Sequence, residues 1–351
     1  MPKILYVITG LTRSGTEKQF YYLIKNLPKN YKVKICTFVE GYYSRELKKE
    51  NYDVIILRRS FSSIKNFLNI LDKFNPDMVH SFLPHANIFC KICNLFRNYK
   101  LICSMRGKEK TFKHFLLSVL ERLLEFQSDF ILTNSYTFKK YLITRLKYNP
   151  NKIKVIYNSF IYEKIKNKTN LYKNKKIILV VANFRPGKDY ITAVKTAKEL
   201  LKYRNDFFFL FVGEGKEKRK IEKYVKKMNL RSYIKFLGLR TDIPNLLLQA
   251  DIFFLPTLYE SQSNAIIESM FYKCPIVTTG IPENKEILEN GKDGLLVRIK
   301  DYKEMTKKIN YLLENKKLKE YLINNAYKKV RKMFNLKKNT KKYLEIYEHM
   351  K

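Results

Sequence analysis

The feature that most constrains the fold is a regular alternation of two kinds of segment. Short runs rich in β-branched and aromatic residues are followed by stretches of ten or more residues with helical periodicity. Such alternation predicts βαβ units, in which a parallel sheet carries helices on both faces. In the first half, the predicted strands are Ile4–Thr9, Val33–Phe38, Val54–Leu57, Met78–His80, Leu101–Ser104, Phe130–Leu132 and Val155–Tyr157. The helices predicted between them include Glu17–Leu27, Ile64–Phe74, Phe112–Phe126 and Tyr136–Leu146.

A polar, charged segment at residues 161–176 interrupts this pattern, and we interpret it as a linker. The alternation then restarts and ends in a helical stretch from Leu318 to Lys351. The second set of predicted strands is Ile177–Ala182, Phe207–Val212, Ile234–Leu237, Ile252–Leu255, Ile276–Thr278 and Leu295–Val297. The second set of predicted helices is Tyr190–Lys202, Lys216–Met228, Asn264–Tyr272 and Tyr302–Leu313.

The two series predict an α/β protein with two Rossmann-like, doubly wound parallel-sheet domains that face a central cleft. The expected domains are residues 1–160 and 177–335, with residues 336–351 forming a C-terminal helix that packs back toward the first domain. The length of 351 residues is enough for two domains that each bury a core. In open parallel sheets, ligands bind outside the carboxyl ends of the strands, so both sets of strand ends are candidates for the site.

The most unusual property of the composition is the net charge of +38, from 70 basic and 32 acidic residues. It favours anionic partners, namely sugar nucleotides, nucleic acid or the anionic cytoplasmic leaflet of a membrane. An AT-rich genome explains many of the lysines but not the shortage of acids. No nucleic-acid-binding module is visible, so we expect no nucleic-acid partner.

Targeting and cysteine signals indicate a cytoplasmic protein. No apolar run reaches the roughly 18 residues that a membrane span needs, and the first residues resemble a strand rather than a signal peptide. The five cysteines are scattered, and Cys90 and Cys93 have no second pair of zinc ligands nearby. We therefore expect free thiols, with this pair on one face of a helix.

The first turn between strand and helix contains Gly10 and Gly15, with the spacing of a phosphate-binding loop. The residues that follow, Thr16 and Glu17, are not the Lys-Ser/Thr pair of a nucleoside triphosphate site, and no G-x-G-x-x-G is present. What remains is a glycine turn that opens a helix, where the backbone can approach an anionic ligand. The alternative is a tight turn without a ligand.

The strongest candidate site follows the strand Ile252–Leu255. Pro256 ends that strand, and Ser263 or Asn264 is suited to cap the next helix. Glu260 is then expected on the loop at the strand's carboxyl end and Glu268 on the helix, about one turn beyond its cap. Amides at the helix start suit a phosphate and the two carboxylates suit hydroxyls, as in a sugar nucleotide. The alternative is two solvated glutamates.

A second anion site is predicted after the strand Ile177–Ala182. Arg185 and Lys188 are two cations at the carboxyl end of this strand, just before a helix. Paired cations at a helix start can stabilise a leaving diphosphate without a metal ion. In so basic a chain, ordinary surface charge is the competing explanation.

These motifs together resemble those of the retaining glycosyltransferases of family 4, which have the GT-B fold. The segment "YESQSNAIIESM" resembles the family's E-x7-E element as Glu260 and Glu268, and "SGTEKQ" resembles its Gly-Gly-Ala-Glu turn. Further similar segments are "ILTNS", "KVIYNS", "IKFLGLRTDIPNLLLQADIFFLPT" and "YKCPIVTTGIPENKEILENGKDGLLV". The resemblance covers nearly the whole chain and is densest in the second half.

The resemblance implies a role for each matching position. Glu260 would bind hydroxyls of the transferred sugar and Glu268 the nucleotide ribose, while Arg185 and Lys188 would hold the diphosphate. Gly15 would allow close approach of the donor or acceptor. Residues expected near the phosphate or base of the donor are Ser263, Asn264, Gly213, Glu214, Leu239 and Arg240. The implied reaction is transfer of a hexosyl or N-acetylhexosaminyl group from a nucleotide diphosphate sugar, with UDP as the commonest nucleotide, to a lipid-linked or polysaccharide acceptor in surface-glycan biosynthesis.

Three positions depart from the family pattern. Ala182-Asn183-Phe184 stands where Gly-Arg-Leu is frequent, Ser14 replaces the first glycine of the turn, and Arg106 follows the strand Leu101–Ser104 where many members have a histidine. Arg106 can contact the sugar or phosphate but cannot act as a neutral base. A nucleotide-binding protein that has lost transfer is therefore an alternative, and a basic nucleic-acid-binding protein is another.

We expect neither a metal ion nor another cofactor, because the chain has no Asp-x-Asp motif. His80 and His85 flank a strand end, where either could face the cleft or be structural.

The predicted helix from Phe112 to Gln127 has a wide apolar face. Basic residues at or just before its start are Arg106, Lys108, Lys110 and Lys113. This combination fits docking on an anionic membrane, which would place the protein peripherally at the inner face of the cell membrane. A helix packed against its own sheet explains the same apolar stripe.

Overall fold

The computed structural model describes residues 1–57, 62–106, 112–162, 172 and 174–351. The chain divides into two compact units. The first unit combines Met1–Ser159 with Leu336–Lys351, and the second is Phe160–Asn335. Most of the linker predicted at 161–176, and the predicted basic residues Lys108 and Lys110, fall outside the described residues.

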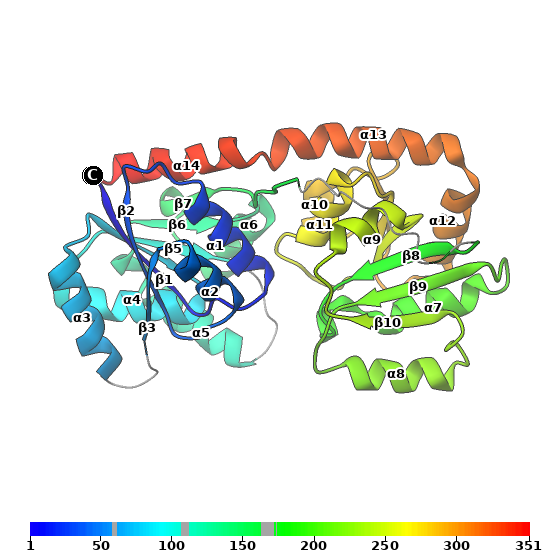
Figure 1. The fold of residues 1–351 in the computed structure, drawn as a ribbon, viewed down its shortest axis with the longest axis horizontal. Helices are drawn as coiled ribbons and strands as arrows, with labels where there is room; N and C mark the ends of the chain where they lie inside the picture. The colour runs from blue at the N-terminus through cyan, green and yellow to red at the C-terminus, as the bar shows by residue number, and fades with distance from the viewer. Residues whose placement is uncertain (58–61, 107–111, 163–171, 173) are drawn as a thin grey trace. The chain divides into compact units, whose positions relative to one another are not determined.

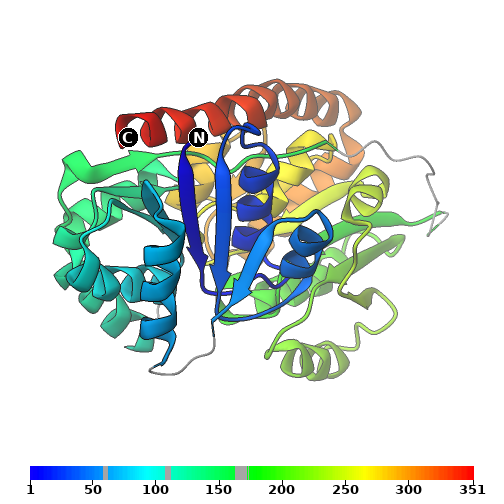
Figure 2. The same ribbon diagram turned by 60° about the vertical axis from the view of Figure 1, so that its left-hand side comes forward.

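A seven-stranded, fully parallel sheet forms the centre of the first unit, with the order β3-β2-β1-β4-β5-β6-β7. Figures 1 and 2 show the strands β1, β2 and β3 side by side at the blue end of the chain. The strands are β1 (Lys3–Ile8), β2 (Lys32–Thr37), β3 (Asp53–Ile56), β4 (Met78–Phe82), β5 (Leu101–Met105), β6 (Phe130–Thr133) and β7 (Ile153–Val155). The sequence predicts the last of these at Val155–Tyr157, which is wrong by two residues.

Both faces of this sheet are covered, as its continuous apolar strands require. Along β1, Ile4, Tyr6 and Ile8 enter one core, while Leu5 and Val7 enter the core on the opposite face. Helices α1 and α14 pack on the first face, and α3 and α4 on the second. The helices of this unit are α1 (Gly15–Lys25), α2 (Tyr42–Lys49), α3 (Ser62–Phe74), α4 (Pro84–Arg97), α5 (Phe112–Leu123), α6 (Tyr136–Leu146) and α14 (Leu336–His349), with the short 3₁₀ turns η1 (Glu125–Gln127) and η2 (Pro150–Lys152).

The C-terminal helix α14 is anchored in the first unit by buried tyrosines. Tyr343 and Tyr347 belong to the same core as Tyr6. The Tyr6 hydroxyl donates to the Tyr347 hydroxyl, at 3.0 Å, and a ring nitrogen of His80 lies 2.8 Å from the Tyr347 oxygen. The last helix of the chain thus completes the core that the first strand begins.

The second unit repeats the design with six parallel strands in the order β10-β9-β8-β11-β12-β13. Its core is rich in phenylalanine, because β9 alone buries three of these side chains against the helices of one face. The strands are β8 (Lys176–Val181), β9 (Phe207–Val212), β10 (Ile234–Gly238), β11 (Ile252–Leu255), β12 (Ile276–Thr279) and β13 (Leu295–Val297). The helices are α7 (Tyr190–Leu200), α8 (Lys218–Lys227), α9 (Ile243–Gln249), α10 (Asn264–Phe271), α11 (Pro282–Ile287), α12 (Tyr302–Glu314) and α13 (Lys316–Met333), with the 3₁₀ turn η3 (Pro186–Lys188).

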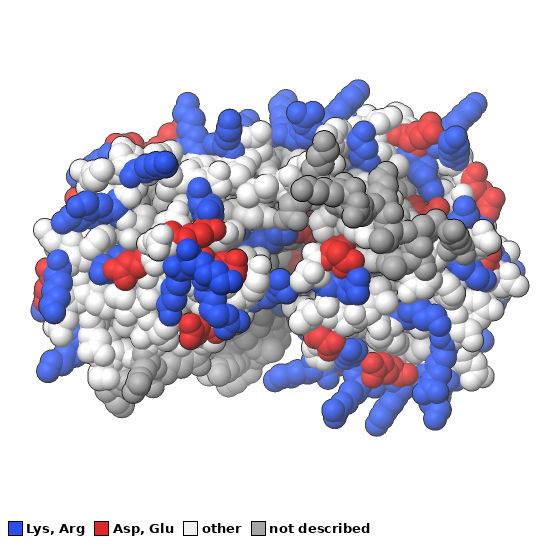
Figure 3. All heavy atoms as spheres, viewed as in Figure 1, with Lys and Arg blue, Asp and Glu red and all other residues white. Residues whose placement is uncertain are grey.

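The excess of basic residues is spread over several elements. Figure 3 shows Lys and Arg side chains gathered over α8 in the second unit and other groups over α13 and α14. On α8 only Ile221 and Val225 are buried, so its basic residues project outward. Within the part of the chain that is described, no helix combines the length and apolar composition needed to span a bilayer. The five cysteines are buried free thiols, and Cys90 and Cys93 share the inner face of α4, as predicted.

Candidate functional site

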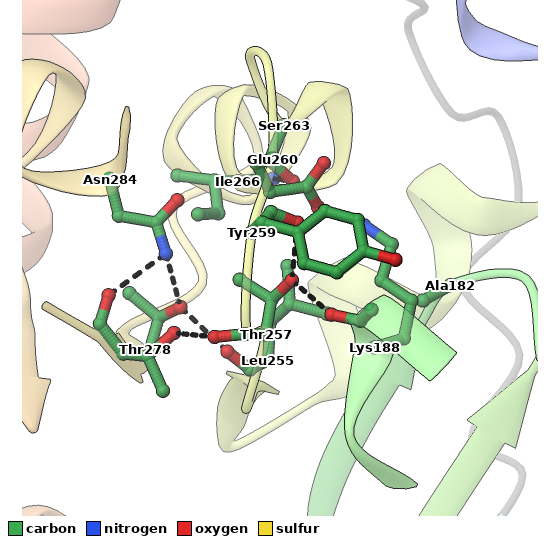
Figure 4. Close-up of polar contacts among 12 residues, drawn as sticks. Ala182, Lys188, Leu255, Thr257, Tyr259, Glu260, Ser263, Ile266, Thr278 and Asn284 are labelled. Atoms are coloured by element: carbon green, nitrogen blue, oxygen red, sulfur yellow. Dashed lines mark hydrogen bonds and ion pairs between the residues drawn. The ribbon is translucent and has the colours of Figure 1, made fainter. Parts of the chain in front are cut away.

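The candidate residues of the second unit gather at the carboxyl edge of its sheet. Because every strand is parallel, the loops that follow β8, β9, β10 and β11 all emerge at this edge. Strands β8 and β11 are direct neighbours in the sheet, although more than 70 residues separate them in sequence. The loop that carries Lys188 therefore lies beside the loop that carries Glu260 (Figure 4).

A buried ion pair joins these two loops. The Lys188 ammonium donates to a carboxylate oxygen of Glu260, and the two residues are 8% and 7% exposed. By themselves, burial and the nearby charge of Arg185 lower the pKa of Lys188 to about 7. The contact with the Glu260 carboxylate acts in the opposite direction, because a negative partner favours the charged ammonium. The sequence predicts the two residues in two separate candidate sites, which only the family resemblance assigns to one donor, and the structure brings them into direct contact.

The turn before Lys188 fits against the loop before Glu260 without room for a side chain. The carbonyl oxygen of Gly187 accepts hydrogen bonds from the Thr257 hydroxyl, at 2.8 Å, and from the Leu258 backbone N–H, at 2.9 Å. A Cβ atom on Gly187 would lie 2.7 Å from the ring of Tyr259. Glycine at this position thus lets the two loops approach closely, which sets the separation of Lys188 and Glu260.

Residues at the end of β12 and on α11 support the same loop. The Thr278 hydroxyl donates to the Leu255 carbonyl, and the Thr279 hydroxyl donates to the Thr257 carbonyl, at 2.7 and 2.5 Å. Asn284 of α11 donates its amide to the Thr278 hydroxyl and to the Thr279 carbonyl (Figure 4). Its Oδ1 atom is buried without a partner among the described residues. The sequence alone gives these supporting residues no role of their own, because their hydrogen-bond partners are distant in sequence.

Helix α10 begins at this edge and carries the second glutamate. Ser263 is its N-cap, and its side chain accepts from the Ile266 backbone N–H. Ser263 rather than Asn264 therefore fills the predicted capping position. Glu268 lies one turn into the helix and is partly exposed, whereas Glu260 is buried on the preceding loop. The two carboxylates thus stand on either side of a helix N-terminus, an arrangement that suits hydroxyl groups flanking an anion.

The loops after β9 and β10 lie next to the loop after β8. Gly213 has a φ of +143°, and a Cβ atom there would lie 2.1 Å from the Ala182 carbonyl oxygen, so a side chain is excluded. The Gly213 N–H donates to the carbonyl of Gly238, at 2.9 Å. Glu214 forms an ion pair with Lys218 at the start of α8. The predicted residues of these two loops therefore share one part of the edge.

The loop after β10 carries two further predicted residues. Leu239 is 64% exposed. Arg240 makes two hydrogen bonds to the carboxylate of Asp242, at 2.7 and 2.8 Å. This pair holds the arginine side chain close to its own loop, while the leucine presents an apolar surface.

Two predicted residues, Gly15 and Arg106, belong to the first unit. Gly15 is the first residue of α1, after the N-cap Ser14, whose side chain makes no capping bond. Arg106 follows β5 and donates to the Asn158 side chain and to the Tyr343 hydroxyl of α14. The guanidinium also lies over the Phe82 ring, 5.7 Å from its centre. The C-terminal helix thus helps to hold the arginine that stands at the family's histidine position.

Glu17 is a further polar residue of this unit, and the sequence alone gives it no role. It lies in the first turn of α1, is 6% exposed, and accepts a hydrogen bond from the Thr12 hydroxyl through one carboxylate oxygen. The other oxygen is buried without a partner among the described residues. Burial raises the pKa of this carboxyl group. The quoted segment "SGTEKQ" contains Glu17, so its position was available in the sequence although its burial was not.

His80 is structural, and the hypothesis that it faces a cleft is wrong. It is fully buried in β4, with ring nitrogens 2.8 Å from the Tyr347 oxygen and 2.9 Å from the Ser104 oxygen. Burial and the charge of Arg106 hold its pKa well below its usual value, so it is neutral at physiological pH. Among the residues that the structure describes, no group of three or more His, Cys, Asp or Glu side chains could hold a metal ion.

Family models match both halves of the chain. The model described as Glycosyltransferase Family 4 matches residues 13–161, and the model described as Glycosyl transferases group 1 matches residues 161–329. Together the two models span both Rossmann-like units, so the chain is a glycosyltransferase with the GT-B fold. The chain belongs to glycosyltransferase family 4.

Relatives and solved structures agree with this assignment. A Campylobacter jejuni enzyme named GalNAc-alpha-(1->4)-GalNAc-alpha-(1->3)-diNAcBac-PP-undecaprenol alpha-1,4-N-acetyl-D-galactosaminyltransferase is 23% identical, over 93% of each chain. The Staphylococcus aureus capsular polysaccharide biosynthesis glycosyltransferase CapM is 25% identical, over 84% of each chain. The crystal structure of Anabaena HepE with UDP and glucose has a TM-score of 0.90 at 17% identity, and the match covers 99% of this chain and 100% of that one. The last comparison shows the fold alone.

Proposed function

We propose that this chain is a retaining glycosyltransferase that moves a hexosyl or N-acetylhexosaminyl group from a UDP-sugar to a lipid-linked or polysaccharide acceptor in surface-glycan biosynthesis. The observation that carries the proposal is the buried pair Lys188–Glu260 at the carboxyl edge of the second sheet. A buried ion pair contributes little net stability, because desolvation of the two charges offsets their attraction. Its position beside a helix N-terminus and glycine-lined loops instead suits recognition of a phosphorylated sugar.

Each charged group of the site has a proposed part in donor binding. Lys188 and Arg185 neutralise the charge of the diphosphate. They also neutralise the additional negative charge that develops on the diphosphate as it leaves during transfer. Glu260 accepts hydrogen bonds from hydroxyls of the sugar, so donor entry exchanges its contact with Lys188 for contacts with the donor. Glu268 accepts from the ribose hydroxyls, as the family resemblance implies.

The nucleotide base and the reaction course follow from the same proposal. The base lies against the loops with Gly213, Glu214, Leu239 and Arg240.

A leaving phosphate oxygen takes the proton of the acceptor hydroxyl as the new glycosidic bond forms and the bond to phosphate breaks. The two cations supply the charge that a metal ion supplies elsewhere, so we propose that the enzyme needs no metal.

The choice of donor and acceptor is supported by the relatives. HepE binds UDP and glucose, and the C. jejuni relative is named for an undecaprenol-linked acceptor. CapM is named for capsular polysaccharide biosynthesis. A lipid-linked acceptor would bring the enzyme to the inner face of the membrane, where the acceptor hydroxyl is presented.

A thermal-shift panel with UDP, GDP, CMP and ADP, with EDTA present throughout, tests the donor site. A nucleotide at about 100 times its dissociation constant adds roughly 2.7 kcal/mol of stability, so UDP should raise the melting temperature and the others should not. Glu268→Gln should reduce the shift, while Glu199→Gln, at the far end of α7 where it pairs with Lys202, should leave it unchanged. The absence of a shift with every nucleotide, also with magnesium, would refute the donor site.

One observation favours a second candidate, a nucleotide-binding protein without transfer. Arg106 occupies the family's histidine position and its guanidinium is held by Asn158 and Tyr343. Turnover distinguishes the two candidates, because release of UDP from a UDP-sugar in the presence of acceptor requires transfer. The anomeric configuration of the product, read by NMR, tests retention separately.

A further inference from the structure

Helix α5 of the first unit turns its apolar side toward solvent and its polar side toward the protein. A helix that covers a sheet normally turns its apolar side inward. From Leu116 to the end of the following turn η1, the outward residues are the apolar ones, and their exposed fractions range from 38% to 66%. These residues are Leu116, Val119, Leu120, Leu123 and Phe126. Their spacing of three and four residues puts them on one side of the helix.

The inward side of α5 is held by polar contacts. Glu121 is 1% exposed and accepts a hydrogen bond from the Asn87 amide, at 2.6 Å. The ammonium of Lys91, a fully buried residue of α4, donates to the Glu121 carbonyl, at 2.7 Å. Glu125 is 5% exposed and accepts from the Asn149 backbone N–H. These contacts orient the helix, since turning it inside out would expose or leave unpaired each of these groups.

From Leu116 onward, this arrangement contradicts the alternative in which the apolar stripe packs against the sheet of its own domain. The stripe is at the surface, and the end of α4 extends it with Leu95 and Phe96, which are 53% and 59% exposed. Asn94 donates its side-chain amide to the Gln127 carbonyl, so the ends of α4 and η1 lie together. Figure 1 shows α4 and α5 as neighbouring helices of the first unit. Exposed apolar side chains that gather on two neighbouring helices in this way mark a docking surface.

The charge around the patch selects the kind of partner. Between Leu116 and Gln127 the only acids are Glu121 and Glu125, and both are buried. Arg122 is partly exposed, forms an ion pair with the Glu125 carboxylate at 2.7 Å and donates to the carbonyl of Lys147. Lys147 is itself exposed at the end of α6 and adds a positive charge beside the patch. A second copy of this chain would bring the same basic side chains toward each other in a symmetric contact, which disfavours it. An anionic bilayer takes up apolar side chains and attracts the basic rim.

We propose that the outward side of α5, with the end of α4, is a docking surface for an anionic lipid bilayer. The leucine and phenylalanine side chains enter the interfacial region, while Arg122 and Lys147 lie at the level of the headgroups. The purpose of docking, access to a lipid-linked acceptor, rests on the proposed function. The binding itself does not, and it can be measured without donor or acceptor.

Flotation with vesicles tests the proposal on the full-length chain. Vesicles of phosphatidylcholine with phosphatidylglycerol should carry the protein upward at physiological salt, and pure phosphatidylcholine vesicles should carry less. The variant Leu123→Ser/Phe126→Ser should bind at least about tenfold more weakly, because two apolar side chains no longer enter the bilayer. The control Ile299→Ser/Tyr311→Ser removes exposed apolar residues of the second unit and should bind within about twofold of the unchanged chain.

Three results would overturn the proposal. The unchanged chain could fail to float with anionic vesicles, or Leu123→Ser/Phe126→Ser could bind as well as the control. Alternatively, light scattering could show a dimer that this variant alone dissociates, which would make the surface a contact between copies. The UDP thermal shift, measured on the same variants, should be unchanged, so loss of docking is distinguishable from failure of the donor site.

Discussion

The ion pair between Lys188 and Glu260 gives a quantitative prediction for the stability of the second unit. The variant Glu260→Gln leaves the Lys188 ammonium buried without its partner. Burial and Arg185 then act alone and lower the pKa of Lys188 from 10.5 to about 7. At 1.36 kcal/mol per pKa unit, that difference corresponds to about 5 kcal/mol of unfavourable free energy for the charged group. Buried pairs that lose one member typically cost about 3–5 kcal/mol, so we expect a loss in this range at pH 7.

The pH dependence of this loss follows from the direction of the pKa change. In Glu260→Gln the folded state holds the Lys188 proton less tightly than the unfolded state does. Between about pH 7 and pH 10.5 the unfolded state therefore binds more protons, and the free energy of unfolding rises with pH, by at most about 1.36 kcal/mol per pH unit. In the unchanged chain the Glu260 carboxylate keeps the lysine charged. The stability gap between the two proteins should thus narrow from pH 7 to pH 9.

Urea denaturation followed by circular dichroism at pH 7, 8 and 9 measures this gap. Because the chain has two units, it can unfold in two transitions. The free energies of unfolding are compared for the transition that Glu260→Gln shifts. The matched controls are Lys188→Met and Lys188→Met/Glu260→Gln, which have no lysine to titrate, and the difference between them should not change with pH. A loss below about 1 kcal/mol, or a gap that stays constant from pH 7 to pH 9, would refute the reasoning.

Three further predictions concern contacts around the candidate site. Gly187→Ala places a Cβ atom 2.7 Å from the Tyr259 ring and should lower kcat/KM for the UDP-sugar about tenfold or more, with an unchanged circular dichroism spectrum. Gly213→Ala puts a side chain at a φ of +143° and against a carbonyl oxygen, so urea denaturation should show a loss of about 2 kcal/mol or more from the second unit. Tyr343→Phe removes the hydroxyl that accepts from Arg106 and should cost the first unit about 2 kcal/mol in the same assay, and an unchanged transition would contradict the role of this contact.

The architecture was predictable because it depends on patterns within short segments. Runs such as Phe207–Val212 and Ile252–Leu255 are apolar throughout, as strands buried on both faces must be, and β9 and β11 begin and end at the predicted residues. The strand β7 was misplaced because its predicted segment, Val155–Tyr157, is equally β-branched and aromatic. Only the pairing with β6 decides the boundary, and on β7 that pairing starts at Ile153.

The contacts within the site were not predictable to the same extent, because they join residues that are distant in sequence. Thr279 supports the loop at Thr257 across 22 residues, and Lys188 meets Glu260 across 72. The orientation of α5 was undecided for the same reason. Its apolar stripe fits either an inward or an outward face, and the choice depends on the buried partners of Glu121 on α4.

The departure at Ala182-Asn183-Phe184 has a structural consequence for the cations that follow it. Phe184 is 1% exposed and stacks on Tyr190, with 4.0 Å between ring centres, so it fixes one end of the loop in the core. Gly187 fixes the other end through its two hydrogen bonds to the loop before Glu260. Arg185 and Lys188 are therefore carried on a segment that is anchored on both sides before any donor binds. Such preorganisation reduces the entropy that donor binding must overcome.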